Sequence, residues 1–182
     1  MLRAPFFLRH RRLYKRLYPV TDTTWQGDKP HLVLKFKVDE EDFLIAGESA
    51  SKTKKALQQL GLKQEIVKNI AIIVYEAAMN IVIHARYGQI TIDIQPDQIT
   101  VISDDVGEGI PDIELAMKEG YSTAPNEVRE MGFGAGMGLP NIKHCSDEMT
   151  LDTRIGEGTI LKATIYLTSR DTQQVEKGAR CV

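Results

Sequence analysis

Cysteine is scarce in this sequence, with only Cys145 and Cys181 among 182 residues. Two cysteines are too few for a disulfide framework, and their spacing does not match that of a metal site. This usage is typical of a reducing compartment, so we expect a cytoplasmic protein. No apolar run approaches the roughly 20 residues that a membrane-spanning helix needs. We therefore expect no membrane partner.

The sequence also lacks a strong excess of charge of one sign. Its net charge is -2, which argues against a general nucleic-acid binder, and we expect no nucleic-acid partner. The basic residues nevertheless gather at the start, where the first 20 residues contain no acid. We interpret 1–29 as a basic and aromatic extension, 30–168 as the domain, and 169–182 as a polar C-terminal tail.

The order of predicted elements favours an α+β layer fold. Alternating apolar residues predict strands at 31–38, 88–95 and 98–105 and a closing hairpin that turns at Gly156 and Gly158. Apolar residues at helical spacing predict a helix that ends near Leu60, a long helix at 64–86, and short helices at 111–119 and 140–145. The glycine-rich and polar stretch 120–135 is predicted to be mobile. Strands in runs beside segregated helices are typical of α+β folds.

The long helix has a polar side within a mostly apolar sequence. Glu76, Asn80 and His84 are spaced four residues apart, so they project from one side of the helix. One interpretation is a solvent-facing stripe on an amphipathic helix. The other is a magnesium site, because Mg²⁺ prefers oxygen ligands and takes few of them from protein. Asn80 offers an amide oxygen, and Glu76 has the chemistry of a general base.

Two glycine-containing segments follow the helix. Asp105, Gly107 and Gly109 form a D-x-G-x-G turn after the strand 98–105, either an ordinary strand exit or a place where a flat ligand such as adenine meets a carboxylate. The segment GFGAGMGL, 132–139, has a glycine at every second position and leads into a predicted helix. A glycine-rich loop before a helix N-terminus can bind an anion; the alternative is a flexible linker.

Together, these motifs resemble the GHKL superfamily of ATPases. Glu76 and Asn80 match its N box, the turn at Asp105 its first glycine box, and 132–138 its second, while GEGT at 156–159 matches a further element near the adenine site. The resemblance covers about 32–167. It implies the Bergerat fold, a two-layer α/β sandwich with a mixed, mostly antiparallel sheet and helices on one face. Within the superfamily, the sequence is similar to the anti-sigma factors and switch serine/threonine kinases of bacterial partner-switching systems.

The resemblance also implies a ligand and a role for each residue. The ligand is Mg-ATP, with Asn80 on Mg²⁺, Glu76 activating the acceptor hydroxyl, and Asp105 recognising adenine with support from Thr159. A lid segment, 112–135, would cover the phosphates, and its Arg129 would either reach the γ-phosphate or stay solvated. The implied ATP-binding residues are Asn80, Asp105, Gly107, Gly109, Ile110, Gly132, Gly134, Ala135, Gly136, Met137, Gly138, Leu139 and Thr159.

Two functions share all these motifs. The first is a protein serine/threonine kinase that transfers the γ-phosphate of ATP to a small STAS-domain antagonist protein. The second is an ATP-binding anti-sigma factor that acts mainly by sequestering a partner, for which a sigma factor is one candidate. A homodimer is compatible with both. The sequence alone does not separate the two functions.

Overall fold

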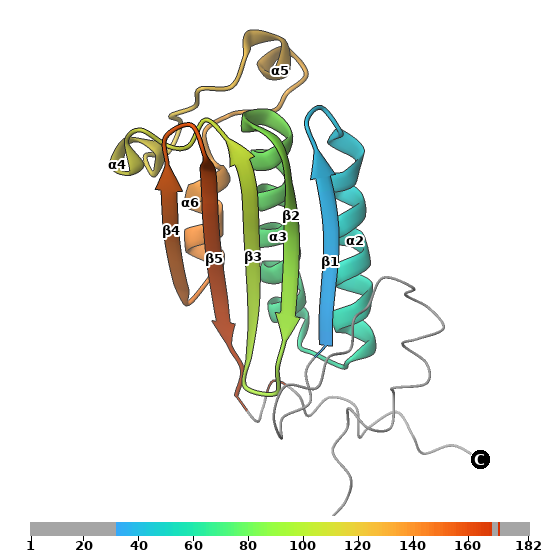
Figure 1. Cartoon of the computed structure of the whole chain (residues 1–182). Helices are drawn as coiled ribbons and strands as arrows, with labels where there is room; N and C mark the ends of the chain where they lie inside the picture. Colours follow the sequence, from blue (N-terminus) through green and yellow to red (C-terminus); the bar gives the residue numbers. More distant parts are fainter. Residues whose placement is uncertain (1–31, 169–170, 172–182) are drawn as a thin grey trace, which may run out of the picture.

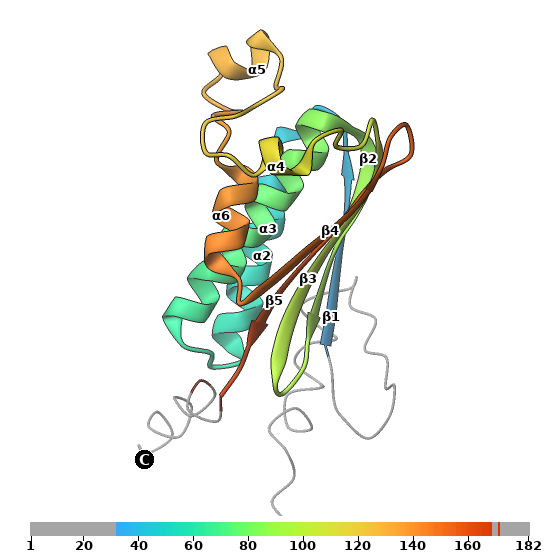
Figure 2. The same cartoon turned by 90° about the vertical axis from the view of Figure 1, so that its left-hand side faces the viewer.

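The computed structural model describes residues 32–168 and Asp171. In this part of the chain, a single sheet is covered on one face by helices, as Figures 1 and 2 show. The predicted two-layer α+β fold is therefore confirmed. The predicted extension 1–29, most of the predicted tail 169–182, and Cys181 lie outside the described residues, so the domain boundaries stay predictions.

The sheet has five strands in the order β1-β2-β3-β5-β4. All four pairings are antiparallel. The prediction was a mixed, mostly antiparallel sheet, and the sheet is instead purely antiparallel. Apolar side chains at alternate positions of the central strands face the helices and are buried, among them Ile90, Ile92 and Val101. The strands are β1 (Leu32–Asp39), β2 (Ala85–Ile94), β3 (Gln98–Gly107), β4 (Glu148–Arg154) and β5 (Gly158–Tyr166).

The helix α3 (Gln64–His84) is the centre of the helical layer. It packs against the sheet and lies between α2 (Phe43–Gln59) and α6 (Gly138–Cys145). Its apolar residues recur at helical spacing, and those on the side facing the sheet and the neighbouring helices are buried, including Ile70, Ile73 and Ile81. The predicted long helix is confirmed, but it ends at His84 because Ala85 already pairs in the sheet.

One expectation from the sequence was that no segment is long and apolar enough to span a membrane, and helix α3 contradicts it. Among the described residues, it is long and apolar enough to cross a membrane when only length and composition are considered. The prediction of no apolar segment of that length was therefore wrong. Half of the most apolar window of α3 is buried inside the domain, because this helix supplies much of the hydrophobic core.

The region between β3 and β4 differs from the prediction in three details. Helix α4 covers only Ile113–Ala116, and Asp112 caps its start by accepting the N–H of Leu115 at 2.9 Å. The stretch predicted to be mobile contains a short helix, α5 (Asn126–Glu130), which starts after Pro125, a residue suited to a helix start. Helix α6 begins at Gly138, two residues before the predicted start, so the last glycine of the run lies in its first turn.

The topology gathers the candidate residues at one end of the molecule. The C-terminal ends of α3 and β3 and the N-terminal ends of α6 and β5 all lie at the upper end in Figure 1. The lid segment, with α4 and α5, is attached at this same end (Figures 1 and 2). The sheet and helix connections therefore bring residues from 76 to 159 into one region.

We expect Ile142 to anchor α6 on the core. Its side chain is fully buried, so Ile142→Ala should lower the free energy of unfolding by about 2–5 kcal/mol in urea titrations. The matched control is Ile160→Ala, because Ile160 is 46% exposed on β5 and its truncation should cost less than about 1 kcal/mol. Equal losses in the two variants would contradict this packing.

Candidate functional site

Glu76 and Asn80 on α3 face the first turn of α6. Both side chains are partly buried and stand one helical turn apart. A β-carbon placed on Gly138 would lie 3.1 Å from Oδ1 of Asn80 and 3.5 Å from Oε2 of Glu76. The glycine therefore leaves space between a carboxylate, an amide and a helix N-terminus. His84, the third member of the predicted polar side, is exposed at the end of α3.

Asn141 joins this group, although sequence reasoning did not select it. Its Nδ2 donates a hydrogen bond of 2.8 Å to Oε1 of Glu76. Asn141 stands three residues after Gly138, a spacing that puts both residues on the same side of a helix. That spacing from the last glycine of the run is the signal in the sequence that could have found it.

Asp105 forms a second group at the end of β3. The backbone N–H of Thr159 donates to its Oδ1 at 3.1 Å, so the structure brings these two site candidates together, while their role toward adenine stays a prediction. A β-carbon on Gly158 would lie 2.0 Å from the carbonyl oxygen of Asp105, so only glycine allows β5 to approach so closely. Burial raises the pKa of Asp105, against the opposing effect of the Thr159 N–H.

Thr153 holds the glycine turn against the β4–β5 hairpin, and sequence reasoning did not select it either. Its Oγ1 accepts the N–H of Ile110 at 2.8 Å and lies 3.0 Å from Oγ1 of Thr159. Gly109 has a left-handed φ of 73°, and a β-carbon there would lie 2.5 Å from the carbonyl oxygen of Arg154. No local pattern in the sequence marks Thr153, because its partners come from β5 and the glycine turn.

Gly107, the remaining glycine of the D-x-G-x-G turn, lies against the C-terminal end of α3. A β-carbon on Gly107 would lie 3.0 Å from both the carbonyl oxygen of His84 and Cα of Ala85. This close approach connects the Asp105 group with the helix that carries Glu76. The two groups therefore belong to one end of the core, as the topology requires.

Two glycines of the segment 132–138, Gly134 and Gly136, lie in close contact with an earlier part of the lid segment. Gly136 has a φ of 74°, and a β-carbon there would lie 2.5 Å from backbone atoms of Gly120 and Tyr121. Its carbonyl accepts the N–H of Gly120 at 3.0 Å. A β-carbon on Gly134 would lie 2.4 Å from Cβ of Ala124. The small residues thus let the chain around 134–136 pack closely against the part of the lid segment at 120–124.

The other predicted residues of this run have different environments. Ala135 and Met137 are exposed, and Met137 precedes α6 without making a side-chain cap. Leu139 is partly buried and packs against the hydrophobic core. Gly132 has nothing within 4 Å of its would-be β-carbon. The surroundings of the glycines therefore change from open space at Gly132 to tight backbone packing at Gly136.

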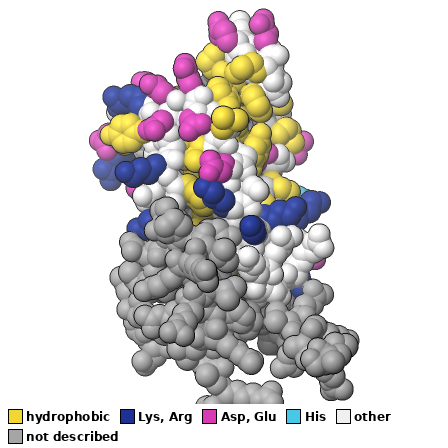
Figure 3. Space-filling model, turned by 90° about the vertical axis from the view of Figure 1, so that its right-hand side faces the viewer, with side chains coloured by type: hydrophobic (Ala, Val, Ile, Leu, Met, Phe, Trp, Pro, Cys, Tyr) yellow, Lys and Arg dark blue, Asp and Glu magenta, His cyan; other side chains and the backbone are white. Residues whose placement is uncertain are grey.

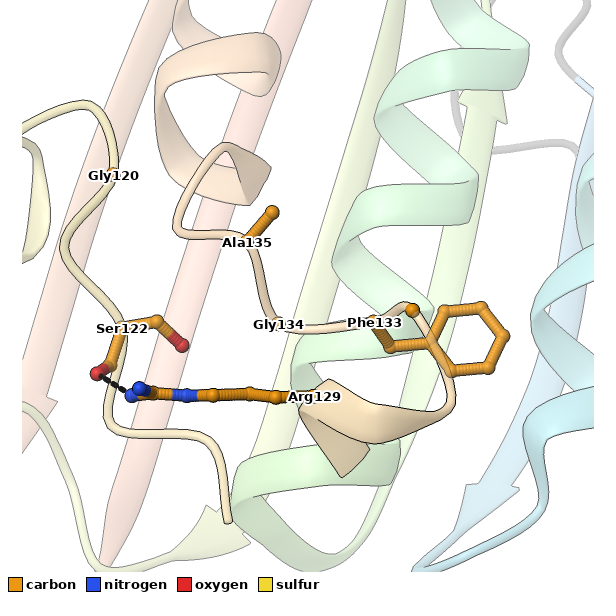
Figure 4. A pocket seen from close by; sticks show the side chains of 7 residues that line it. Gly120, Ser122, Arg129, Phe133, Gly134 and Ala135 are labelled. Carbon is orange, nitrogen blue, oxygen red and sulfur yellow. Dashed lines mark hydrogen bonds between the residues drawn. The ribbon is translucent and has the colours of Figure 1, made fainter. Parts of the chain in front are cut away.

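An open cavity of about 290 Å³ is lined by residues of the lid segment, and no residue of the Asp105 group is part of its lining. Its lining includes Ser122, Arg129 and Phe133, which Figure 4 labels. The guanidinium of Arg129 donates from Nη2 to the carbonyl oxygen of Ser122 at 2.6 Å, the dashed line in Figure 4. Arg129 is thus exposed and bound within the lid segment, and the choice between a γ-phosphate contact and a solvated arginine stays a prediction.

An aromatic contact attaches the lid segment to α2. The rings of Phe43 and Phe133 are stacked with centroids 5.3 Å apart. Leu44, the residue after Phe43, is 84% exposed, and Met131, two residues before Phe133, is 54% exposed. Figure 3, which views the molecule from the right of Figure 1, shows hydrophobic side chains gathered on its upper part with acidic side chains near them. The lid segment is therefore held to the start of α2 by apolar contacts.

Within the described ranges, no group of three or more His, Cys, Asp or Glu side chains could hold a metal ion. Asn80 is the predicted metal-binding residue, and its oxygen faces the first turn of α6. One amide oxygen with phosphate and water oxygens is a donor set that suits Mg²⁺.

Comparison with known proteins identifies the family. Residues 47–165 match the histidine kinase-like ATPase domain. The chain is 35% identical over 114 residues to the serine/threonine-protein kinase RsbT of Bacillus subtilis, covering 60% of this chain and 80% of RsbT. It is also 35% identical over 116 residues to the anti-sigma F factor of Thermoanaerobacter sp. (strain X514), covering 61% and 78% of the two chains.

The chain belongs to the histidine kinase-like ATPase domain family, and its relatives place it in the branch of partner-switching kinases and anti-sigma factors. A chain in the crystal structure of the SiaB-SiaC complex from Pseudomonas aeruginosa has the same fold, with a TM-score of 0.53 and 16% identity. That match covers 87% of this chain and 96% of the other. The predicted resemblance is confirmed.

We expect the packing at Gly136 to hold the lid segment in place. Gly136→Ala should destabilise this segment, because it adds both a left-handed backbone strain of about 1–2 kcal/mol and a backbone clash. Gly132→Ala is the matched control: its φ of 88° imposes similar strain, but the space around it is open. Hydrogen exchange of 112–135 should accelerate much more in Gly136→Ala, and equal acceleration would contradict the packing.

Proposed function

We propose that this chain is a protein serine/threonine kinase that transfers the γ-phosphoryl group of Mg-ATP to a hydroxyl of a small partner protein. The observation that carries the proposal is the convergence of Glu76 and Asn80 on Gly138 at the start of α6. It joins a carboxylate that can act as a base, an oxygen ligand and an anion-binding helix end in one place. Membership of the family and the similarity to RsbT support it.

The nucleotide would lie across both groups of residues. Adenine would meet Asp105, whose carboxylate can accept a hydrogen bond from an exocyclic amine, with Gly107 and Gly109 shaping the pocket. The phosphates would lie at the N-terminus of α6, where the helix dipole favours negative charge and no side chain caps the helix. Gly134, Gly136 and Gly138 would be the residues nearest to them, and the lid segment would cover them.

Magnesium would be held by Asn80 together with phosphate oxygens. The bound ion would neutralise charge on the phosphates and keep their geometry fixed. The protein's own part is to position the amide oxygen of Asn80, which α3 presents to the space beside Gly138. The partly buried setting of Asn80 limits competition from water.

Glu76 would act as the base for the acceptor. Its carboxylate accepts the proton of the serine or threonine hydroxyl, whose oxygen forms a bond to the γ-phosphorus as the bond to the β–γ bridging oxygen breaks. ADP is the leaving group. Positioning and charge neutralisation supply most of the catalysis in such transfers. Glu76 supplies the remaining part, the removal of the proton.

The partner and the cellular location that we propose are supported by the similarity to partner-switching proteins. A STAS-domain antagonist is the phosphoacceptor we propose, with a sigma factor or another regulator as a further partner. We also propose a cytoplasmic location, and homodimerisation is compatible with this role. The relatives named anti-sigma F factor favour a second candidate, a module that sequesters its partner and uses ATP as a structural switch. Measurement of phosphate transfer separates the two.

We predict that Glu76→Gln removes phosphate transfer while nucleotide binding stays. The tagged chain would be added to its source lysate with Mg-ATP, and serine and threonine phosphosites would be mapped on co-purifying proteins. Loss of a general base should slow transfer by about 10²–10⁴-fold. Glu65→Gln is the matched control, because Glu65 is exposed in the first turn of the same helix. A partner that binds only with nucleotide and gains no phosphate would favour sequestration instead.

We predict that Asp105 makes nucleotide affinity depend on pH. Burial raises the pKa of its carboxyl, so protonation begins at a higher pH than for an ordinary aspartate near about 3.9. Below that raised pKa, affinity for a fluorescent ADP analogue should fall by up to about tenfold per pH unit. Asp105→Asn should bind weakly at every pH. Unchanged nucleotide affinity in Asp105→Asn would contradict the proposal that Asp105 binds adenine.

A further inference from the structure

The hydrogen bond between Asn141 and Glu76 connects two helices that are far apart in sequence. It is a side-chain hydrogen bond between the first turn of α6 and the middle of α3, with Nδ2 at 2.8 Å from Oε1. A carboxylate has no proton to donate when ionised, so the amide nitrogen must be the atom that faces it. Asn141 is thus a donor to the residue proposed as the base.

Asn141 is itself held firmly. Its backbone N–H donates to the carbonyl oxygen of Met137 at 2.8 Å, in the first turn of α6. The next residue, Ile142, is fully buried against the core. These contacts fix the position of the Asn141 backbone, and the hydrogen bond from its side-chain amide holds one oxygen of Glu76.

This contact makes the two carboxylate oxygens of Glu76 different. Oε1 is engaged by Asn141, whereas Oε2 faces the space at Gly138, 3.5 Å from the would-be β-carbon there. The terminal torsion of a glutamate side chain has broad minima, so an unrestrained carboxylate would rotate freely. The hydrogen bond selects one orientation, with Oε2 turned toward the place where phosphates are proposed to bind.

We propose that Asn141 is a positioning residue for phosphate transfer: it orients the Glu76 carboxylate so that Oε2 receives the proton of the acceptor. This inference rests on the proposed kinase function. An amide suits the role, because it donates one hydrogen bond and adds no charge that would compete for the carboxylate. Since Asn141 and Gly138 share the first turn of α6, the same helix sets the base and the phosphate site.

The test compares steady-state kinetics of three Asn141 variants on the acceptor protein identified in the lysate experiment. Asn141→Ala and the isosteric Asn141→Asp both remove the donor, and each should lower kcat by about 10- to 100-fold without changing KM for ATP. Asn141→Gln keeps an amide and should recover part of the loss. Asn69→Ala, a partly buried asparagine elsewhere on α3, is the control.

A double-mutant cycle separates positioning from a structural role. In a Glu76→Gln background, where the base is already lost, Asn141→Ala should cause no further loss of the residual rate, because residues that act as a unit are non-additive. Additive losses, or a wild-type kcat in Asn141→Ala and Asn141→Asp, would overturn the inference. Full transfer activity in Glu76→Gln itself would instead overturn the proposed function. Thermal unfolding of each variant verifies that it is folded.

Discussion

The contact of α3 with the first turn of α6 is the constraint on which the rest of the site depends. Helix α3 is the core helix of the domain, and its buried side fixes where its two polar side chains point. Gly138 permits α6 to approach Glu76 and Asn80 with no side chain between them. A larger residue there would fill the space in which the proposed phosphates and Mg²⁺ are to meet the protein.

The glycines of this protein have two different structural roles. Some allow chain segments to contact each other: Gly136 packs on Gly120, and Gly158 packs on Asp105. Gly138 instead keeps a space open beside polar side chains. The alternation of glycine in 132–138 therefore reflects the packing of the lid segment as well as the proposed approach of phosphate.

Much of the fold could be predicted from the sequence. The strands alternate clearly, and α3 has apolar residues at helical spacing over its whole length. Glu76, Asn80 and Asp105 were identifiable because the motifs around them are local. The roles of these residues come from the resemblance of the motifs to the GHKL superfamily.

The parts that escaped prediction depend on contacts between distant segments. Asn141 becomes important only because α6 packs beside Glu76, 65 residues earlier in the chain. Thr153 bonds with Ile110, 43 residues away. Helix α5 is only five residues long, which is too short for a periodic pattern, and it formed where glycine and polar residues had suggested a mobile loop.

The most direct test of the central claim is a crystal structure of the full chain with Mg²⁺ and a non-hydrolysable ATP analogue. The account predicts adenine against Asp105, the terminal phosphates at the first turn of α6 beside Gly138, and the ion on Oδ1 of Asn80. Phosphates bound elsewhere, such as in the lid cavity lined by Arg129 and Phe133, would contradict it.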